Sequence, residues 1–153
     1  MFNKSFIRII LSILAVTAFG FILLGITFIF NFLVFQLIDL IFPPGEVEPN
    51  QWLPLIRHGV FLIIIGLISW PIFKSRLPIL LKAIYMTVPV AVFLATLGIF
   101  LYQWPFILYP VGTIFILLVL FYFYRTKKPW LYYYSVILVS ISLMIFTLSG
   151  GEI

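Results

Sequence analysis

The sequence contains no cysteine and a single histidine, His58. Without cysteine the chain can form no disulfide, iron–sulfur cluster, thiol nucleophile or Cys-x-x-Cys redox pair. With one histidine and no His-Glu-x-x-His pattern, a zinc site of two histidines and a carboxylate is excluded as well. Neither a P-loop nor a Gly-x-Gly-x-x-Gly motif is present. We therefore expect no metal site and no cofactor.

Charge is also scarce, because only 8% of the 153 residues are charged and 65% are hydrophobic. The mean hydropathy is +1.30. A soluble domain of this size needs far more polar surface, so we expect the lipid bilayer to be the main partner. The net charge of +5 does not indicate nucleic-acid binding, since basic residues beside an anionic membrane surface account for it.

Five apolar runs, each long enough to cross the hydrocarbon core of a bilayer, divide the chain. We predict spans at residues 9–38, 54–73, 78–101, 105–124 and 130–148, with a proline-rich loop at 42–53. The other connections are short, so neighbouring spans should pack antiparallel. The expected fold class is all-α, a five-helix transmembrane bundle forming one domain over residues 1–153.

Basic and acidic residues occupy opposite ends of these spans. Eight of the nine Lys and Arg residues lie at the start of the first span or around the second and fourth connections, namely Lys4, Arg8, Lys74, Arg76, Lys82, Arg125, Lys127 and Lys128. All four acids lie on the other side. Because cytoplasmic connections carry an excess of Lys and Arg, we predict a cytoplasmic N-terminus and an external C-terminus. Short loops suit a multi-pass protein of a bacterial cytoplasmic (inner) membrane.

The first apolar stretch is longer than one span needs. Phe6 to Ile38 contains 33 residues, and a helix of that length is about 50 Å long, against about 30 Å of hydrocarbon. Either this helix is strongly tilted, or it bends and its second part lies near the external interface.

Tryptophan and tyrosine gather at the span boundaries, where amphipathic rings prefer the headgroup layer. The four tryptophans are Trp52, Trp70, Trp104 and Trp130. The tyrosines expected in the cytoplasmic belt are Tyr122, Tyr124, Tyr132, Tyr133 and Tyr134.

A polar cluster is expected near the external ends of the first two spans, which share the proline-rich loop. Its members are Asn31, Gln36 and Asp39 from the first span and Arg57 and His58 from the first turn of the second, with Thr27 as a further candidate. These side chains could form an outward-facing pocket for an anion or a lipid headgroup. Alternatively, Arg57 pairs with Asp39 or with a loop glutamate and fixes the loop. We favour the second interpretation and predict that Asp39 and Arg57 interact.

Catalytic sets are missing from the span centres, which carry no Asp, Glu, Lys, Arg or His. This argues against a carrier built on a buried carboxylate and excludes an intramembrane aspartyl protease. Ser140 and Ser142 lie at a different depth from every lysine and from the histidine, so no base can activate them. We expect such hydroxyls to bond a carbonyl one turn earlier or to join helices.

Small residues predict where helices approach closely. Ala91, Ala95 and Gly98 share a face of the third span, and Gly59, Gly66 and Ser69 share a face of the second. Gly20 and Gly25 in the first span are less well aligned. These faces could serve helix packing within the chain or contact with a partner subunit.

Function is therefore inferred mainly from exclusion. We expect a non-enzymatic membrane protein, an accessory or regulatory subunit or a small binding protein that uses the external polar cluster. A membrane-protein partner or a homo-oligomer fits this expectation. The alternatives are a small transporter or permeation component, and an intramembrane enzyme that acts on lipid.

Overall fold

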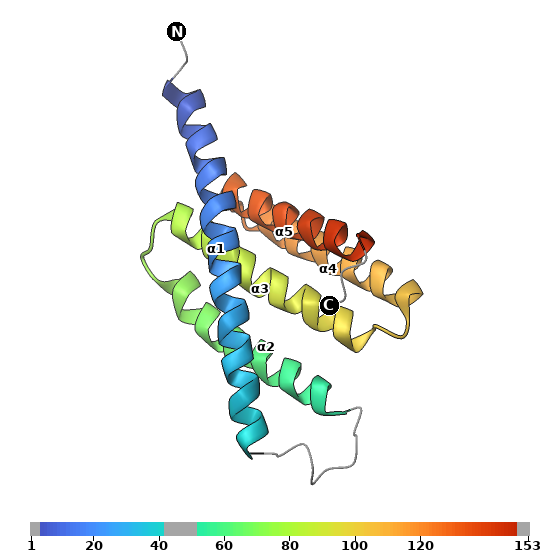
Figure 1. The fold of residues 1–153 in the computed structure, drawn as a ribbon. Coiled ribbons are helices and arrows are strands. Elements are labelled where there is room, and N and C mark those ends of the chain that lie inside the picture. Colours follow the sequence, from blue (N-terminus) through green and yellow to red (C-terminus); the bar gives the residue numbers. More distant parts are fainter. Residues whose placement is uncertain (1–3, 42–51, 150–153) are drawn as a thin grey trace.

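The computed structural model describes residues 4–41 and 52–149, and they form five α-helices (Figure 1). The helices are α1 Lys4–Ile41, α2 Trp52–Lys74, α3 Ile79–Phe100, α4 Pro105–Arg125 and α5 Trp130–Leu148. All five are long and apolar enough to cross a membrane. The all-α expectation is confirmed, and the largest difference in bounds is at α1, which begins at Lys4 rather than residue 9. All but the last two residues of the 42–53 loop lie outside the described residues.

Helix α1 is a single uninterrupted helix of 38 residues, about 57 Å long at 1.5 Å per residue. It crosses α3 obliquely, and its first turns project beyond the other four helices (Figure 1). The first apolar stretch is therefore one helix and is not divided into two. Only Val16, Gly20 and Val34 of α1 are buried.

Helix α3 forms the centre of the bundle because it packs against each of the other four helices. Eight of its residues are buried, whereas Phe123 is the one buried residue of α4. Figure 1 shows α2 on one side of α3 and α4 with α5 on the other. Within the described residues, α2 packs directly against neither α4 nor α5. Helix α3 therefore lies between α2 and α4 and contacts both of them.

The side of α3 that faces α1 and α5 is tightly packed. A Cβ atom on Gly20 would lie 3.1 Å from Cγ2 of Thr87, so α1 approaches α3 as closely as its glycine permits. The hydroxyl of Ser135 in α5 donates to the carbonyl oxygen of Ala83 in α3 at 2.6 Å and to that of Leu131 at 2.9 Å. Ser135 is fully buried.

The remaining hydroxyls behave as the sequence predicted. Ser140 and Ser142 each donate to the carbonyl four residues earlier. Thr17 of α1 does the same and also lies 2.7 Å from the hydroxyl oxygen of Tyr134 in α5. The expectation that hydroxyls bond the preceding turn or join helices is confirmed.

Two expectations about packing differ from the structure. Gly59, Gly66 and Ser69 were expected to share a face for packing within the chain or for a partner subunit, but a Cβ atom on either glycine would meet nothing within 4 Å, so the two glycines make no close approach within the chain. Ser69 alone is buried. Tyr132 was expected in an aromatic belt, yet its side chain is 7% exposed and packs edge-to-face on Phe123, with ring centroids 5.7 Å apart. It belongs to the core between α3, α4 and α5.

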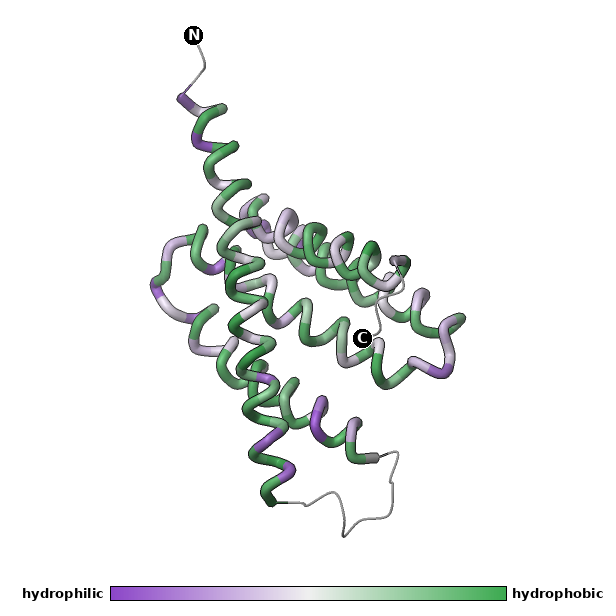
Figure 2. The backbone as a smooth tube through the Cα atoms, viewed as in Figure 1, coloured by the Kyte–Doolittle hydropathy of each residue, from purple (hydrophilic) through white to green (hydrophobic). Residues whose placement is uncertain are grey.

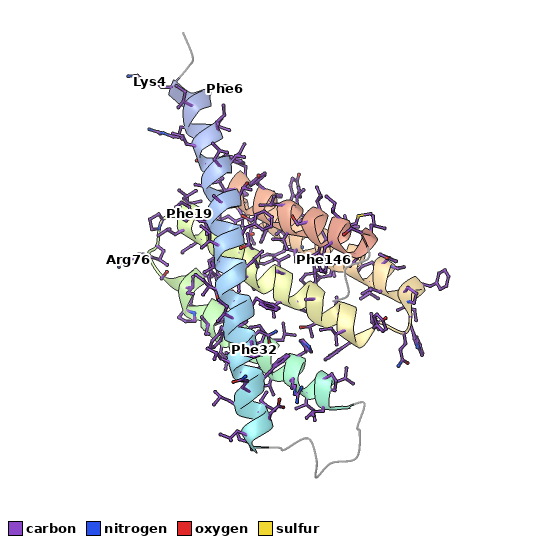
Figure 3. All side chains as sticks on the ribbon, in the orientation of Figure 1. Lys4, Phe6, Phe19, Phe32, Arg76 and Phe146 are labelled. Carbon is purple, nitrogen blue, oxygen red and sulfur yellow. The ribbon has the colours of Figure 1, made fainter. Side chains whose placement is uncertain are left out.

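Most residues along the helices are hydrophobic, and many of the hydrophilic ones lie toward the helix ends and the connections (Figure 2). Figure 3 shows side chains projecting from the helices around the bundle, with Phe19 and Phe32 labelled on α1, each 57% exposed. Lys82 and Lys128 line one and the same cavity, which places the α2–α3 and α4–α5 connections at the same end. We call this end the basic end.

Candidate functional site

Residues of the predicted polar cluster lie toward the other end of the bundle, where the structure brings them together in two separate groups. Asp39 of α1 and Arg57 of α2 form an ion pair through Oδ1 and the Nη2 group. The prediction that they interact is confirmed. Helix α2 begins at Trp52, two residues earlier than expected, so Arg57 and His58 lie in its second turn rather than its first.

The ion pair sits at the margin of the bundle, beside the ends of the loop. The Asp39 side chain is 36% exposed and that of Arg57 is 22% exposed. The Arg57 guanidinium carbon lies 5.9 Å from the ring centroid of Phe35, and its Nε atom is buried without a hydrogen-bond partner among the described residues. Because Arg57 is partly desolvated, the loss of Asp39 would leave a poorly solvated cation. Glu46 and Glu48, the alternative partners, lie outside the described residues.

His58, the neighbour of Arg57 in α2, contacts the same phenyl ring of Phe35 and also lines a cavity. Its ring meets the ring of Phe35 edge-on, with centroids 4.8 Å apart at 88°. On its other side it lines a cavity of about 340 Å³ together with residues of α1, α3 and α5. Phe35 therefore fixes the imidazole between the ion pair and the cavity.

The cavity has four polar side chains in an apolar lining. They are Thr27, Asn31, His58 and Thr96. We call this space the acceptor cavity, for the reason given next. Its volume is at the lower end of the range of small-molecule sites, in which a few polar groups orient a mostly apolar ligand.

The cavity contains three side-chain oxygen atoms that can accept a hydrogen bond, beside the N–H donors of Asn31 and His58. The hydroxyl of Thr27 donates to the carbonyl of Leu23 at 2.8 Å, and that of Thr96 donates to the carbonyl of Val92 at 2.7 Å. Since a hydroxyl has one proton, both oxygens remain available only as acceptors. Oδ1 of Asn31 is buried and has no hydrogen-bond partner among the described residues. A buried acceptor without a donor costs about 1–3 kcal/mol.

The structure thus joins Thr27, Asn31 and His58 in one cavity and separates them from Asp39 and Arg57. Gln36 is exposed and lines no cavity together with them. Sequence reasoning missed Thr96 and also the role of Ala91 and Ala95, which line the cavity. The face of small residues on α3 was the available signal, but it was interpreted as a packing surface.

No group of three or more His, Asp or Glu side chains in residues 4–41 and 52–149 could hold a metal ion. Comparison with protein-family models, curated proteins and solved structures finds no match. The functional argument therefore rests on the geometry of the chain itself.

Proposed function

We propose that the chain is a small non-enzymatic integral membrane protein that binds a neutral hydroxylated amphiphile in the acceptor cavity. Membrane insertion is supported by five helices of sufficient length and apolarity. It is also supported by the large apolar side chains exposed along them, for which lipid is the natural solvent.

The proposed orientation places the basic end in the cytoplasm and the acceptor cavity toward the outside. Its support is the position of eight basic residues at one side of the spans and of all four acids at the other. A periplasmic reporter should be active after the C-terminus or after Gly45 and inactive after Lys74 or Lys128. A C-terminal reporter active only in the cytoplasm would overturn this orientation.

The observation that carries the binding proposal is Oδ1 of Asn31, which is buried without a hydrogen-bond partner among the described residues, inside a cavity that offers two further acceptor oxygens. A ligand that completes this site must bring a hydrogen-bond donor. No acidic side chain among the described residues lines the cavity, so an ammonium group would be buried without a counter-ion. A hydroxyl group is the donor that avoids this cost.

The rest of the ligand must be apolar, because Phe28, Phe61 and Phe146 and several aliphatic side chains form the remaining wall. A long-chain alcohol or another hydroxylated lipid has this combination. Such a ligand would reach the cavity from the membrane, in which it is already concentrated.

The test uses a photoreactive long-chain alcohol carrying a diazirine, with the matched diazirine alkane as a probe that lacks the hydroxyl. Wild-type protein in detergent micelles should be labelled by the alcohol, with cross-links on residues of the cavity. Asn31→Leu should reduce labelling about tenfold, since one hydrogen bond in an apolar site is worth about 1.4 kcal/mol. Ala95→Phe, which fills the cavity, should abolish it.

Gln36→Leu is the matched control, because Gln36 lies on the same helix as Asn31 and lines no cavity with it. Its labelling should equal that of wild type. Equal labelling by the alkane, or an unchanged signal in Asn31→Leu, would show that the probe binds the apolar wall alone and would end the proposal.

An accessory-subunit role is the second candidate, and α1 supports it. The first turns of α1 project beyond the other helices (Figure 1), and Ile7, Leu11 and Leu14 expose large apolar side chains there. A partner helix could pack there. Co-purification in mild detergent, compared between wild type and a Leu11→Ser/Leu14→Ser variant, tests this candidate.

A further inference from the structure

A second and larger cavity, about 760 Å³ in volume, lies on the open side of the bundle between α2 and α4. Its floor is α3, since α2 and α4 do not pack directly against each other. The lining is aliphatic and aromatic except at the basic end, where Lys82 and Lys128 line it together with Tyr122 and Tyr132. We call this cavity the lysine groove.

Lys82 is held in position by the end of α2. Its ammonium group donates to the carbonyl oxygens of Phe73 at 2.9 Å and Ser75 at 2.6 Å. An ammonium group has three N–H donors, so one remains for an anion. Although Lys82 is half-buried in an apolar lining, no acid lies near it in the sequence, and none of the described residues at this end of the bundle is an acid.

Lys128 is placed at the same end by a specific turn. The amide of Lys128 donates to the carbonyl of Phe123 at 2.9 Å, and the amide of Lys127 donates to that of Tyr124 at 3.2 Å. With Lys127 at φ 50°, these bonds form a Schellman motif that ends α4. The turn fixes the backbone at Lys128, whose side chain lines the groove from the α4–α5 connection.

The apolar part of the groove has the length of one acyl chain in one leaflet. Lys82 and Phe93 both line the floor, and eleven residues of α3 separate them by about 16 Å. Half of the hydrocarbon core of a bilayer is about 15 Å. At the far end Phe93 and Phe115 stack with ring centroids 3.9 Å apart, which closes the groove near the middle of the bundle.

Gly66 on the α2 wall keeps the groove wide. A Cβ atom there would meet nothing within 4 Å, so the residue is not needed for a close helix approach. On the floor, Pro89 has no amide hydrogen and leaves the carbonyl of Tyr85 without its usual helical donor.

We propose that the lysine groove binds one anionic phospholipid, with its phosphate between Lys82 and Lys128 and one acyl chain along α3. The lipid comes from the leaflet at the basic end. This inference rests on the membrane insertion proposed above and is independent of the acceptor cavity.

Charge complementarity favours this occupant over a second copy of the chain. Asp39, the one acid among the described residues, lies at the opposite end of the bundle from the two lysines, so an identical parallel chain offers no described carboxylate at their depth. A free phosphate could meet the lysines but would leave the apolar groove unfilled. A phospholipid satisfies both parts.

The experiment is native mass spectrometry of delipidated protein, released from detergent after incubation with equal amounts of palmitoyl-oleoyl phosphatidylglycerol and phosphatidylcholine. Wild type should retain one phosphatidylglycerol, preferred about tenfold over phosphatidylcholine because the lysines bond its anionic headgroup. Lys128→Gln should remove most of this preference. Gly66→Leu should lower retention of both lipids by occupying the acyl path.

Each variant has a matched control. Lys74→Gln removes a lysine at the same end whose Nζ lies 4.3 Å from the Trp70 ring centroid and which does not line the groove. Gly59→Leu adds a leucine on α2 where a Cβ atom also meets nothing and which lies outside the groove. Both controls should bind lipid as wild type does. If Gly66→Leu alters the thermal midpoint without lipid, Lys128→Gln decides the test.

Equal retention of the two lipids by wild type, or equal losses in Lys74→Gln and Lys128→Gln, would show only general surface attraction and would overturn the proposal. Displacement of phosphatidylglycerol by millimolar inorganic phosphate alone would do the same. Carbonate extraction of the native membrane tests membrane insertion separately from lipid binding. Protein that stays in the membrane pellet but shows no lipid preference would refute binding in the lysine groove and leave membrane insertion standing.

Discussion

Gly20 and Gly66 are the same residue in two opposite situations, one on each side of α3. At Gly20 a single added carbon would press on Thr87 at 3.1 Å, whereas at Gly66 it would meet no atom within 4 Å. The first glycine lets α1 pack on α3, and the second borders a groove of about 760 Å³. A small residue in an apolar helix therefore marks either a close contact or a space kept open.

The two sides also differ in how their helices are joined. On the α1–α3–α5 side, the Ser135–Ala83 bond and the Thr17–Tyr134 contact connect neighbouring helices, and Val16 and Ala83 are fully buried. On the α2–α4 side, α3 is the one helix of the described residues that contacts both walls, and the hydroxyl groups of Ser69 and Tyr85 join α2 to it. In lipid, helix association depends on such packing and interhelical bonds. We infer that the first side stabilises the fold and that the second is available for a ligand.

The largest expected effect comes from replacing each glycine with leucine, which tests whether the two sides of α3 differ in packing. Gly20→Leu should destabilise the bundle by about 3 kcal/mol, because overpacking must separate α1 from α3. Gly25→Leu, five residues along the same helix, and Gly66→Leu should each change stability by less than about 0.5 kcal/mol, since a Cβ atom at either site meets nothing within 4 Å. Unfolding in mixed micelles titrated with dodecyl sulfate measures all three.

A loss in Gly66→Leu as large as that in Gly20→Leu would mean that α2 packs on a neighbour there, and the open-side interpretation would fail. The sequence alone gives the opposite ranking. It aligns Gly59, Gly66 and Ser69 as a packing face and treats Gly20 as poorly aligned.

The helices themselves could be predicted closely because their length and apolarity are properties of consecutive residues. The end of α5 at Leu148 and the start of α4 at Pro105 agree with the sequence prediction. The start of α1 does not agree with the prediction, because Lys4 and Arg8 were expected to precede the span and are part of the helix. A helix can continue past the hydrocarbon when its backbone hydrogen bonds are made internally, so charge limits the span and not the helix.

Packing between helices could be predicted only in part, because it depends on crossing angles that the sequence does not specify. Asp39 and Arg57 were found since one loop joins the ends that carry them. Asn31 and His58 come close to Thr96 because α1 crosses α3 obliquely. The lysine groove exists because α2 and α4 do not pack against each other. Neither arrangement can be predicted from the sequence. The position of Tyr132 at the end of a span does not show whether its ring lies in the membrane interface or in the core of the bundle.

The Asp39–Arg57 ion pair joins the end of α1 to α2, the helix that borders the open side of α3. Its contribution to stability can be measured with a double-mutant cycle. Asp39→Asn or Arg57→Gln alone should cost about 2 kcal/mol, because each leaves a partly desolvated charge without its partner. The double variant should cost less than the sum of the two. Thermal stability of the four proteins in one detergent gives the coupling energy.

Strictly additive losses in that cycle would mean that the pair contributes no coupling and that both side chains are held by water or by the loop. Gln36→Leu, an exposed change on the same helix, provides the baseline and should be neutral. A double variant that recovers nearly the full stability of wild type would instead fit a pair whose desolvation cost equals its attraction.

The smallest expected effect concerns the turn that presents Lys128 to the groove. Lys127 has a φ of 50°, a left-handed conformation that glycine adopts without the steric cost of a Cβ atom. Lys127→Gly should therefore stabilise the protein by about 0.5–1 kcal/mol, while Thr126→Gly, at φ −91°, should destabilise it by a similar amount. The lipid preference of Lys127→Gly should stay that of wild type, because the turn still places Lys128. If the preference for phosphatidylglycerol falls although stability rises, the charge of Lys127 itself contributes to headgroup binding. The headgroup site of the lysine groove would then include a third lysine beside Lys82 and Lys128.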